Sequence, residues 1–354
     1  MTDHPVLRPD VAALPAYIAG RKADGAQVAA LASNESHFPP LATVVEAVGA
    51  AAQRINRYPD MGSVALRERI ATAAGLPVEA VAVGPGSVGV LAQLISALCG
   101  PGDEVVFAWR SFEAYPILAQ IAGATTVRVP LTADERHDLP AMAAAVNPRT
   151  KVVLLCSPNN PTGTSITEDE LHRFLAAVPS RVLVVLDEAY REYAAAPDSS
   201  ALLGRYPNLA LLRTFSKAYG LAGLRVGYAL ASPALAEGMR KTQIPFSVSN
   251  VAEAAALAAL DGAEQLQDRV AAVIGERERI VPAVRELGWR LPDSTANFLW
   301  LRTTDSEREA LVAAFESAAI LVRGYPGDGV RITVADRAGN DRVLQVLASF
   351  PRQD

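Results

Sequence analysis

The feature that most constrains the fold of this chain is a pair of continuous apolar runs near its middle. They are KVVLLCS (151–157) and RVLVVLDEA (181–189), and between them EDELHRFLAAV (168–178) has helical periodicity. An uninterrupted apolar run is typical of a strand that is buried on both faces, as in a parallel sheet covered by helices. The order strand, helix, strand therefore predicts a crossover unit of an α/β fold.

The same alternation continues on both sides of this unit. Further strand-like segments occur at 81–84, 104–108, 125–130, 209–216 and 224–231, and helical segments at 44–55, 88–99 and 112–123. A long helical stretch, 250–287, then precedes strands at 289–292, 297–302, 320–325 and 330–335 and helices at 306–318 and at the C-terminus. We predict an α/β fold in which a mostly parallel seven-stranded sheet lies between helices, followed by a smaller α+β domain.

The length of the chain, 354 residues, is more than one hydrophobic core usually serves, so we expect two domains. Residues 1–30 contain several Pro and Gly residues and have no clear period. We expect them to form an arm that packs on the small domain or on a partner subunit. The large domain is expected to span residues 31–245, and the small C-terminal domain residues 246–354.

Charge and composition argue against several classes of protein. The net charge is −5 and no dense stripe of Lys and Arg occurs, which argues against a nucleic-acid partner. The N-terminus lacks the apolar core of a signal peptide, and no run of about 18 apolar residues is present to span a membrane. Cys99 and Cys156 lie in apolar runs, and the four His are scattered without metal-ligand spacing. We expect a cytoplasmic enzyme without a metal site.

Polar residues follow the predicted strands at the ends where ligands bind in an open α/β sheet. SPNNPTG (157–163) turns the chain directly after one buried strand, and Asp187 ends the next. Lys217 follows a third strand, with Ser216 before it and Arg225 further along. A glycine-rich turn in VGPGSVGVL (83–91) joins a fourth strand to a helix, and the first amides of a helix can bind an anion.

Each of these segments has an ordinary explanation when it is taken alone. Turns end many strands, a carboxylate at a strand end can be solvated, and a lysine in this position is more often a surface residue. All four segments, however, are expected at one edge of one sheet. A lysine whose pKa is lowered by partial burial is a nucleophilic amine, and an arginine beside it can hold a phosphate. The combination indicates an enzyme site.

Three motifs resemble, in this order, the signature of fold-type I pyridoxal-phosphate (PLP) aminotransferases: SPNNPTG, LDEAY (186–190) and TFSKAYGLAGLRVGY (214–228). The resemblance starts at LASNES (31–36) and NRYPD (56–60), extends to VRITVA (330–335), and is closest to the histidinol-phosphate aminotransferase branch. Within this branch, INRYPDMG (55–62) and WRSFEAYP (109–116) look most similar to aromatic amino acid (phenylalanine) aminotransferases of actinobacterial type.

The resemblance implies catalytic roles for three residues. Lys217 would hold PLP as a Schiff base and then act as the general acid and base of the proton shift. Asp187 would pair with the ring nitrogen of the cofactor and keep it protonated, which makes the ring an electron sink. Tyr190 would hydrogen-bond the phenolic oxygen. The other positions that match cofactor-binding residues of the family are Ser87, Val88, Phe112, Asn160, Ser216 and Arg225.

The resemblance also assigns these other positions. Phe112 would stack on the ring, and Asn160 would share the phenolic oxygen with Tyr190. The remaining four would bind the phosphate. Tyr58 matches a tyrosine that reaches the phosphate of the neighbouring subunit's cofactor, which implies a homodimer with shared active sites. The positions that match the substrate pocket are Arg331, for the α-carboxylate, Arg323, Asn34 and Tyr17.

The function implied most directly is transfer of an amino group from Phe, Tyr or Trp to 2-oxoglutarate. One alternative is a histidinol-phosphate aminotransferase, which would bind a phosphate at the far end of the pocket. Arg323 does not decide between them, because it could hold either that phosphate or the distal carboxylate of glutamate. A PLP-dependent decarboxylase is the alternative from another reaction class, since one scaffold supports several reactions. A PLP-binding regulator without activity is disfavoured because the motifs leave no room for a DNA-binding module.

Overall fold

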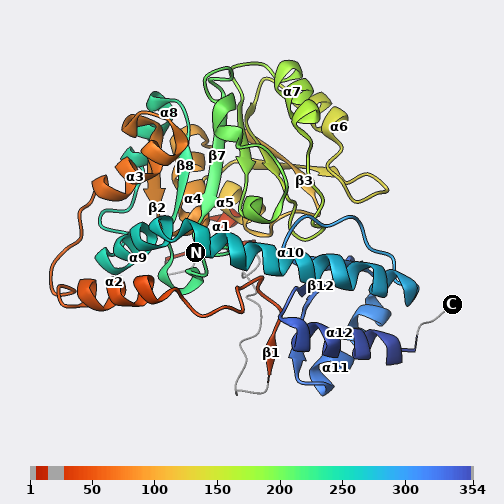
Figure 1. The fold of residues 1–354 in the computed structure, drawn as a ribbon. Coiled ribbons are helices and arrows are strands. Elements are labelled where there is room, and N and C mark those ends of the chain that lie inside the picture. Colours follow the sequence, from red (N-terminus) through yellow and green to blue (C-terminus); the bar gives the residue numbers. More distant parts are fainter. Residues whose placement is uncertain (1–4, 15–27, 352–354) are drawn as a thin grey trace.

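The computed structural model describes residues 5–14 and 28–351 of the chain. Figure 1 shows a large domain built on one sheet and, below it, a smaller domain, with a long helix running between the two. Tyr17, which the sequence places in the substrate pocket, lies outside the described residues. No helix among the described residues is both long and apolar enough to cross a membrane.

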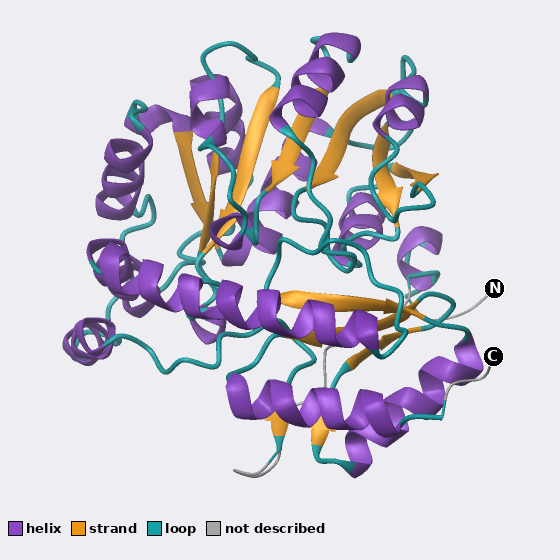
Figure 2. Ribbon diagram, turned by 45° about the vertical axis from the view of Figure 1, so that its right-hand side comes forward, coloured by secondary structure: helices purple, strands orange, loops and turns teal. Residues whose placement is uncertain are grey.

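The main sheet confirms the predicted α/β fold. Its seven strands, all within residues 28–351, follow one another across the sheet in the order β2 (Val81–Gly84), β8 (Gly227–Leu230), β7 (Leu209–Thr214), β6 (Leu183–Asp187), β5 (Thr150–Cys156), β3 (Glu104–Trp109) and β4 (Thr125–Pro130). Strand β8 runs antiparallel to both of its neighbours, and every other pair is parallel. The parallel strands end on the side of the sheet that faces the small domain (Figure 2).

Helices cover both faces of this sheet. Those of the large domain are α2 (Ala42–Ala52), α3 (Val64–Ala74), α4 (Gly86–Leu98), α5 (Ala114–Ile121), α6 (Leu139–Ala144), α7 (Glu168–Ala177), α8 (Pro233–Lys241) and α9 (Asn250–Asp261). Successive side chains of a strand point to opposite faces. On β5, Val153 and Leu155 accordingly join the core that contains Ala255 of α9, whereas Val152 joins the core that contains Leu91 of α4.

The crossover helix between the two apolar runs illustrates how the sequence determines where a helix begins and which face it buries. Helix α7 begins with a capping box, in which the Thr167 hydroxyl accepts from the Glu170 amide (3.3 Å) and the Glu170 carboxylate accepts from the Thr167 amide (2.8 Å). Its apolar side chains Leu171, Phe174 and Leu175 are buried against the sheet. The helix therefore returns the chain from β5 to β6 with one face in the core, as the sequence predicts.

The small domain is built around a three-stranded antiparallel sheet with the order β11-β12-β9. Its elements are α10 (Ala263–Glu286), β9 (Phe298–Arg302), α11 (Asp305–Ser317), β10 (Ile320–Leu321), β11 (Arg323–Tyr325), β12 (Gly329–Thr333) and α12 (Arg337–Ser349). The N-terminal arm contributes β1 (Ala29–Ala30), which pairs with β10. The short helix α1 (Pro9–Ala12) lies near α5, where the side chain of Arg8 donates to the Ile121 carbonyl (3.0 Å).

Two predicted elements differ in the structure. The helical stretch 250–287 is divided at Gly262 into α9 and α10, because α9 packs into the core of the large sheet while α10 packs with the small domain. We therefore propose that the domain boundary lies at Gly262 rather than at residue 246. The strand expected at 289–292 is wrong: this segment is irregular, and the Trp289 indole is buried and donates to the Leu347 carbonyl of α12 (3.4 Å).

The main sheet comes very close to a helix at Gly227, where β8 passes the start of α4. A Cβ atom on Gly227 would lie 2.7 Å from the Gly86 carbonyl carbon and 3.0 Å from the Arg213 oxygen, both backbone atoms. We expect Gly227→Ala to lower the thermal unfolding midpoint, because overpacking of this kind costs about 1–3 kcal/mol.

The matched control for this substitution is Gly275→Ala in the middle of α10, where an added Cβ meets no atom within 4 Å. Since alanine is favoured over glycine inside a helix by about 0.5–1 kcal/mol, this variant should unfold at a higher temperature than the parent. Equal midpoints for the two variants would show that the approach at Gly227 is not tight.

Candidate active site

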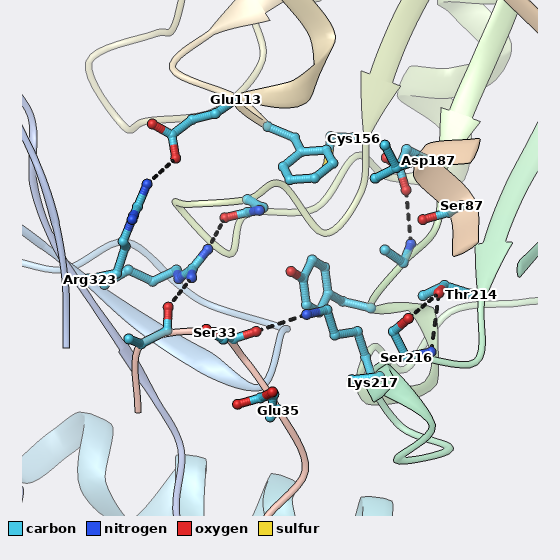
Figure 3. A pocket seen from close by; sticks show the side chains of 18 of the residues that line it. Ser33, Glu35, Ser87, Glu113, Cys156, Asp187, Thr214, Ser216, Lys217 and Arg323 are labelled. Atoms are coloured by element: carbon cyan, nitrogen blue, oxygen red, sulfur yellow. Dashed lines mark hydrogen bonds and ion pairs between the residues drawn. The ribbon is translucent and has the colours of Figure 1, made fainter. Parts of the chain in front are cut away.

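A cavity of about 300 Å³ lies where the carboxyl ends of the main strands meet the small domain. Both domains and the segment after β1 contribute to its wall. Figure 3 shows the lining side chains converging on this space. Those that the sequence predicts are Ser87, Val88, Phe112, Asn160, Asp187, Tyr190, Ser216, Lys217, Arg225, Arg323 and Arg331. The motifs that lie far apart in the sequence therefore form one site.

Lys217 comes directly after β7 and reaches across to the segment that follows β1. Its Nζ donates to the Ser33 carbonyl (2.8 Å) (Figure 3). Burial lowers the pKa of the Lys217 amine to about 7; the positive charges of Arg331 and Arg225 act in the same direction, and the negative charge of Glu35 opposes them. A lysine normally titrates far above neutrality. At neutral pH this one is therefore neutral in a large fraction of molecules, as a nucleophilic amine requires.

Asp187 ends β6 and its carboxylate is buried on the opposite side of the cavity from Ser33. The Tyr115 hydroxyl donates to Oδ2 (2.7 Å) and the Ala189 amide donates to Oδ1 (3.2 Å). Burial raises the pKa of Asp187 to about 6, and these two hydrogen bonds oppose the rise because they favour the ionised form. The result is a carboxylate in an apolar setting, which suits a cationic partner in the cavity.

An anion cradle lies at the start of α4. Gly86 has a φ of 75°, and a Cβ atom there would collide with the Arg225 guanidinium, so the close approach needs glycine. Arg225 itself has a φ of 55°, which is uncommon for a residue with a side chain. It donates to the Ser216 hydroxyl (3.3 Å), which also accepts from Thr214 (3.0 Å). A helix N-terminus, hydroxyls and a guanidinium together suit a phosphate.

Arg331, on β12, brings a second guanidinium into the cavity. It donates to the Asn160 side chain (2.5 Å) and to the Ala32 carbonyl (2.6 Å), and its side chain is almost fully buried. Its Nε is buried and has no hydrogen-bond partner among the described residues. Because buried donors are normally paired, this free N–H indicates a ligand that accepts a hydrogen bond at the position of Arg331.

Tyr190 and Asn34 form a polar contact beside Lys217. The Asn34 side chain donates to the Tyr190 hydroxyl (2.9 Å), and Asn34 is held in a left-handed conformation with φ 54°. Asparagine is among the few residues that adopt this conformation readily. Asn34, which the sequence places in the substrate pocket, does not itself line the cavity, but its hydrogen bond holds the Tyr190 hydroxyl in place.

The site contains residues that the sequence analysis missed. Tyr115 is one of them: it lies in the first turn of α5 and contacts the ring of Phe112, which precedes the helix (5.6 Å between centroids), and no local sequence pattern marks it. Glu113 is another, and it forms an ion pair with Arg323 (2.9 Å). The other residues of the wall that had not been singled out include Ser33, Glu35, Cys156, Thr214 and Tyr325.

Tyr58 does not join the cavity of its own chain. Its ring is 83% exposed and stacks on Phe246 (4.6 Å between centroids), and neither residue lines the cavity. Its assigned role is toward a neighbouring subunit, which stays a prediction. No group of His, Cys, Asp and Glu in the described part of the chain has the geometry to hold a metal ion.

Comparison with known proteins identifies the family of this chain. The family of class I and II aminotransferases matches residues 26–347. The chain belongs to this family. The aromatic amino acid aminotransferases of Streptomyces avermitilis and Streptomyces coelicolor are 48% and 49% identical to it, each over 99% of this chain and 98% of the relative.

Solved structures of aminotransferases share the fold. Histidinol-phosphate aminotransferase from Sinorhizobium meliloti, solved in complex with pyridoxal-5'-phosphate, has a TM-score of 0.88 and 30% identity over 97% of this chain and 96% of that one. An aspartate aminotransferase of Thermus thermophilus has a TM-score of 0.80 at 24% identity over 97% of this chain and 100% of that one, which shows the fold alone. The predicted family and fold-type I architecture are confirmed.

The hydrogen bond from Tyr115 to Asp187 leads to a prediction about this aminotransferase. Because the bond stabilises the ionised carboxylate, Tyr115→Phe should raise the pKa of Asp187 above its present value of about 6. The pKa can be measured in the cofactor-free protein by infrared titration of isotope-labelled aspartate.

Tyr193→Phe is the control, because Tyr193 is also a buried tyrosine but is not among the main groups that shift the pKa of Asp187. It should leave the titration unchanged. A Tyr115→Phe titration that matches the parent would contradict the assigned hydrogen bond.

Proposed function

We propose that this aminotransferase binds pyridoxal 5'-phosphate and moves the amino group of an aromatic amino acid to 2-oxoglutarate. The observation that carries the proposal is the placement of the Lys217 amine, with its pKa lowered to about 7, in one cavity with the Asp187 carboxylate and the anion cradle. These are the three groups that would recognise the aldehyde, the ring nitrogen and the phosphate of the cofactor. The aromatic substrate is supported by the names of the most similar relatives.

The residues of the cavity fit the cofactor from end to end. Arg225, Ser216 and the first amides of α4 at Ser87 and Val88 would hold the phosphate. Asp187 would accept a hydrogen bond from the protonated ring nitrogen, which would relieve the cost of burying this carboxylate. When bound, the cofactor supplies an electron sink for the bond that is broken at the substrate's α-carbon.

Three further side chains would orient the ring. The Phe112 ring lies in the wall of the cavity and would stack on one face. Tyr190 and Asn160 would donate to the phenolic oxygen, and both already take part in hydrogen bonds, to Asn34 (2.9 Å) and to Arg331 (2.5 Å). Such second contacts hold the donors in place before the ligand arrives, which favours catalysis.

Lys217 would move the proton during the reaction. A general base works best when its pKa is near the working pH, and burial brings the pKa of Lys217 to about 7. The amine would take the proton from the substrate's α-carbon as a general base and would then give it up again as a general acid. Arg331 would hold the α-carboxylate by two parallel hydrogen bonds, for which its buried Nε is available.

A histidinol-phosphate aminotransferase is the second candidate, supported by the Sinorhizobium meliloti structure at 30% identity. Its substrate would place a phosphate against the far wall, where Arg323 lies. Arg323 is already paired with Glu113 (2.9 Å), so a phosphate would first have to displace the Glu113 carboxylate, whereas an aromatic side chain leaves the pair intact. The geometry therefore favours the aromatic substrate over histidinol phosphate.

The amine of Lys217 is the first target for a test. Lys217→Ala should bind the cofactor without forming the covalent link, so the visible absorption band of the linked cofactor should be lost and turnover should fall by several orders of magnitude, roughly 10⁴-fold or more. Spectra and initial rates with phenylalanine measure both effects. A yellow, active Lys217→Ala enzyme would disprove the assignment.

The substrate is tested by comparing kcat/KM for phenylalanine and for histidinol phosphate, with 2-oxoglutarate as the acceptor in both assays. We expect phenylalanine to be preferred by about tenfold or more, because the Glu113 carboxylate disfavours the phosphate. A preference for histidinol phosphate would leave the transaminase proposal intact and would overturn the aromatic substrate.

We also propose a homodimer. Large apolar side chains are exposed on neighbouring parts of the large domain, around α2, α3 and the loop that precedes α9, and such patches are typical of interfaces. They are Val45, Ile55, Tyr58, Met61, Val64, Ile244 and Phe246. In this arrangement Tyr58 would donate to the cofactor phosphate of the partner subunit.

The dimer proposal predicts separate effects on assembly and on cofactor binding. Tyr58→Phe keeps the stacking ring and removes only the hydroxyl, so sedimentation should still give a dimer. The Kd for the cofactor should rise by about 10-fold to 100-fold, since a hydrogen bond to a charged group contributes about 1.5–3 kcal/mol. A monomeric parent protein would refute the dimer, and an unchanged Kd in a dimeric variant would refute the role of the hydroxyl.

A further inference from the structure

The ion pair between Glu113 and Arg323 forms part of the cavity wall. Glu113 precedes α5 in the large domain, Arg323 begins β11 in the small domain, and both line the cavity. The Arg323 guanidinium donates to the Glu113 carboxylate (2.9 Å), as Figure 3 shows, and lies over the Tyr325 ring (5.4 Å). The Arg323 side chain is 13% exposed and that of Glu113 is 29% exposed, so the acid is the more accessible partner.

The other two arginines of the cavity already have roles. Arg225 belongs to the phosphate cradle, and Arg331 is fixed by Asn160 and the Ala32 carbonyl. Arg323 differs from them because its charge is balanced by a carboxylate on a partly exposed side chain. Because the Glu113 side chain is 29% exposed and can turn toward water, another carboxylate that reaches the guanidinium can compete with it.

The proposed reaction makes two opposite demands on this part of the cavity. An aromatic side chain is uncharged, and a buried guanidinium without a partner beside it would be unfavourable. The 2-oxoglutarate that follows it ends in a carboxylate, which needs a cation. A permanently unpaired arginine would suit only the second substrate, and a permanently paired arginine would suit only the first.

We propose that Glu113 is a specificity residue that competes with the distal carboxylate of the acidic substrate for Arg323. Glu113 neutralises Arg323 while an aromatic substrate is bound. It is released toward solvent when 2-oxoglutarate or glutamate takes its place on the guanidinium. This inference rests on the proposed function, because it requires the two kinds of substrate to use the same cavity.

A purely structural explanation is that the pair only fastens the two domains together. A second ion pair provides the comparison, because it spans the same junction outside the cavity. Arg110, from the same loop as Glu113, donates through Nε to Asp328 between β11 and β12 (2.7 Å), and neither residue lines the cavity. Asp328→Asn is therefore a matched control for Glu113→Gln, since each replaces one acid of an interdomain pair by its amide.

The test measures binding of two unreactive substrate mimics to the holoenzyme by calorimetry. Glutarate carries the distal carboxylate, and 3-phenylpropanoate carries the aromatic ring. For Glu113→Gln we expect the Kd for glutarate to fall about fivefold, because the competitor is lost, while the Kd for 3-phenylpropanoate stays equal or rises. In steady state, the KM for 2-oxoglutarate should fall with little change in kcat for phenylalanine.

The control decides between the two explanations. A changed ratio of the two Kd values in Glu113→Gln, together with the parent ratio in Asp328→Asn, supports competition at Arg323. The same ratio in all three proteins, or the same change in both variants, overturns it. A parent enzyme that binds glutarate but not 3-phenylpropanoate refutes the aromatic substrate, and the glutarate Kd of Glu113→Gln then still decides the role of Glu113. A parent that binds neither mimic refutes both proposals.

Discussion

The partial burial of the Lys217 amine in the cavity wall is the constraint on which the rest of the site depends. The amine lies at the carboxyl end of β7, where burial and the positive charges of Arg331 and Arg225 lower its pKa to about 7. Its hydrogen bond goes to a backbone carbonyl, that of Ser33 (2.8 Å), rather than to a carboxylate. A carboxylate in that position would have favoured the charged ammonium, whereas a neutral acceptor leaves the amine free to lose its proton.

The same low-polarity setting shifts the pKa of Asp187 in the opposite direction, because burial disfavours the charged form of an acid as well as that of a base. Burial raises the pKa of this carboxylic acid to about 6 while it lowers that of the lysine to about 7, so both groups titrate close to neutral pH. The Tyr115 hydroxyl then pulls Asp187 back toward the ionised form. One low-polarity environment, adjusted by the hydrogen bonds from Tyr115 and the Ala189 amide, thus prepares both a base and a counter-ion for a cationic ring.

The sequence predicts the parts of this site that come from the ends of strands, and it misses those that come from elsewhere. Lys217, Asp187 and Asn160 follow apolar runs, so the topology of a parallel sheet brings them to one edge. Tyr115 and Glu113 lie at the start of a helix, where no local pattern shows which side chain meets a residue of another strand or domain. The strand expected at 289–292 is absent for a related reason. The apolar side chain of Trp289 packs against α12 of the small domain, and a buried apolar residue does not by itself indicate a strand.

The junction between the domains explains why the missed residues matter. Arg331 reaches Asn160, Arg323 reaches Glu113 and Arg110 reaches Asp328, so three guanidinium contacts connect the two domains around or beside the cavity. Two of these contacts involve groups that a substrate carboxylate can replace or join, and the third does not face the cavity. Substrate charge therefore bears directly on how the small domain meets the large one. If a substrate carboxylate takes the place of Glu113 as we propose, the contacts of Arg331 with Asn160 and of Arg110 with Asp328 keep the domains connected while Arg323 changes its partner.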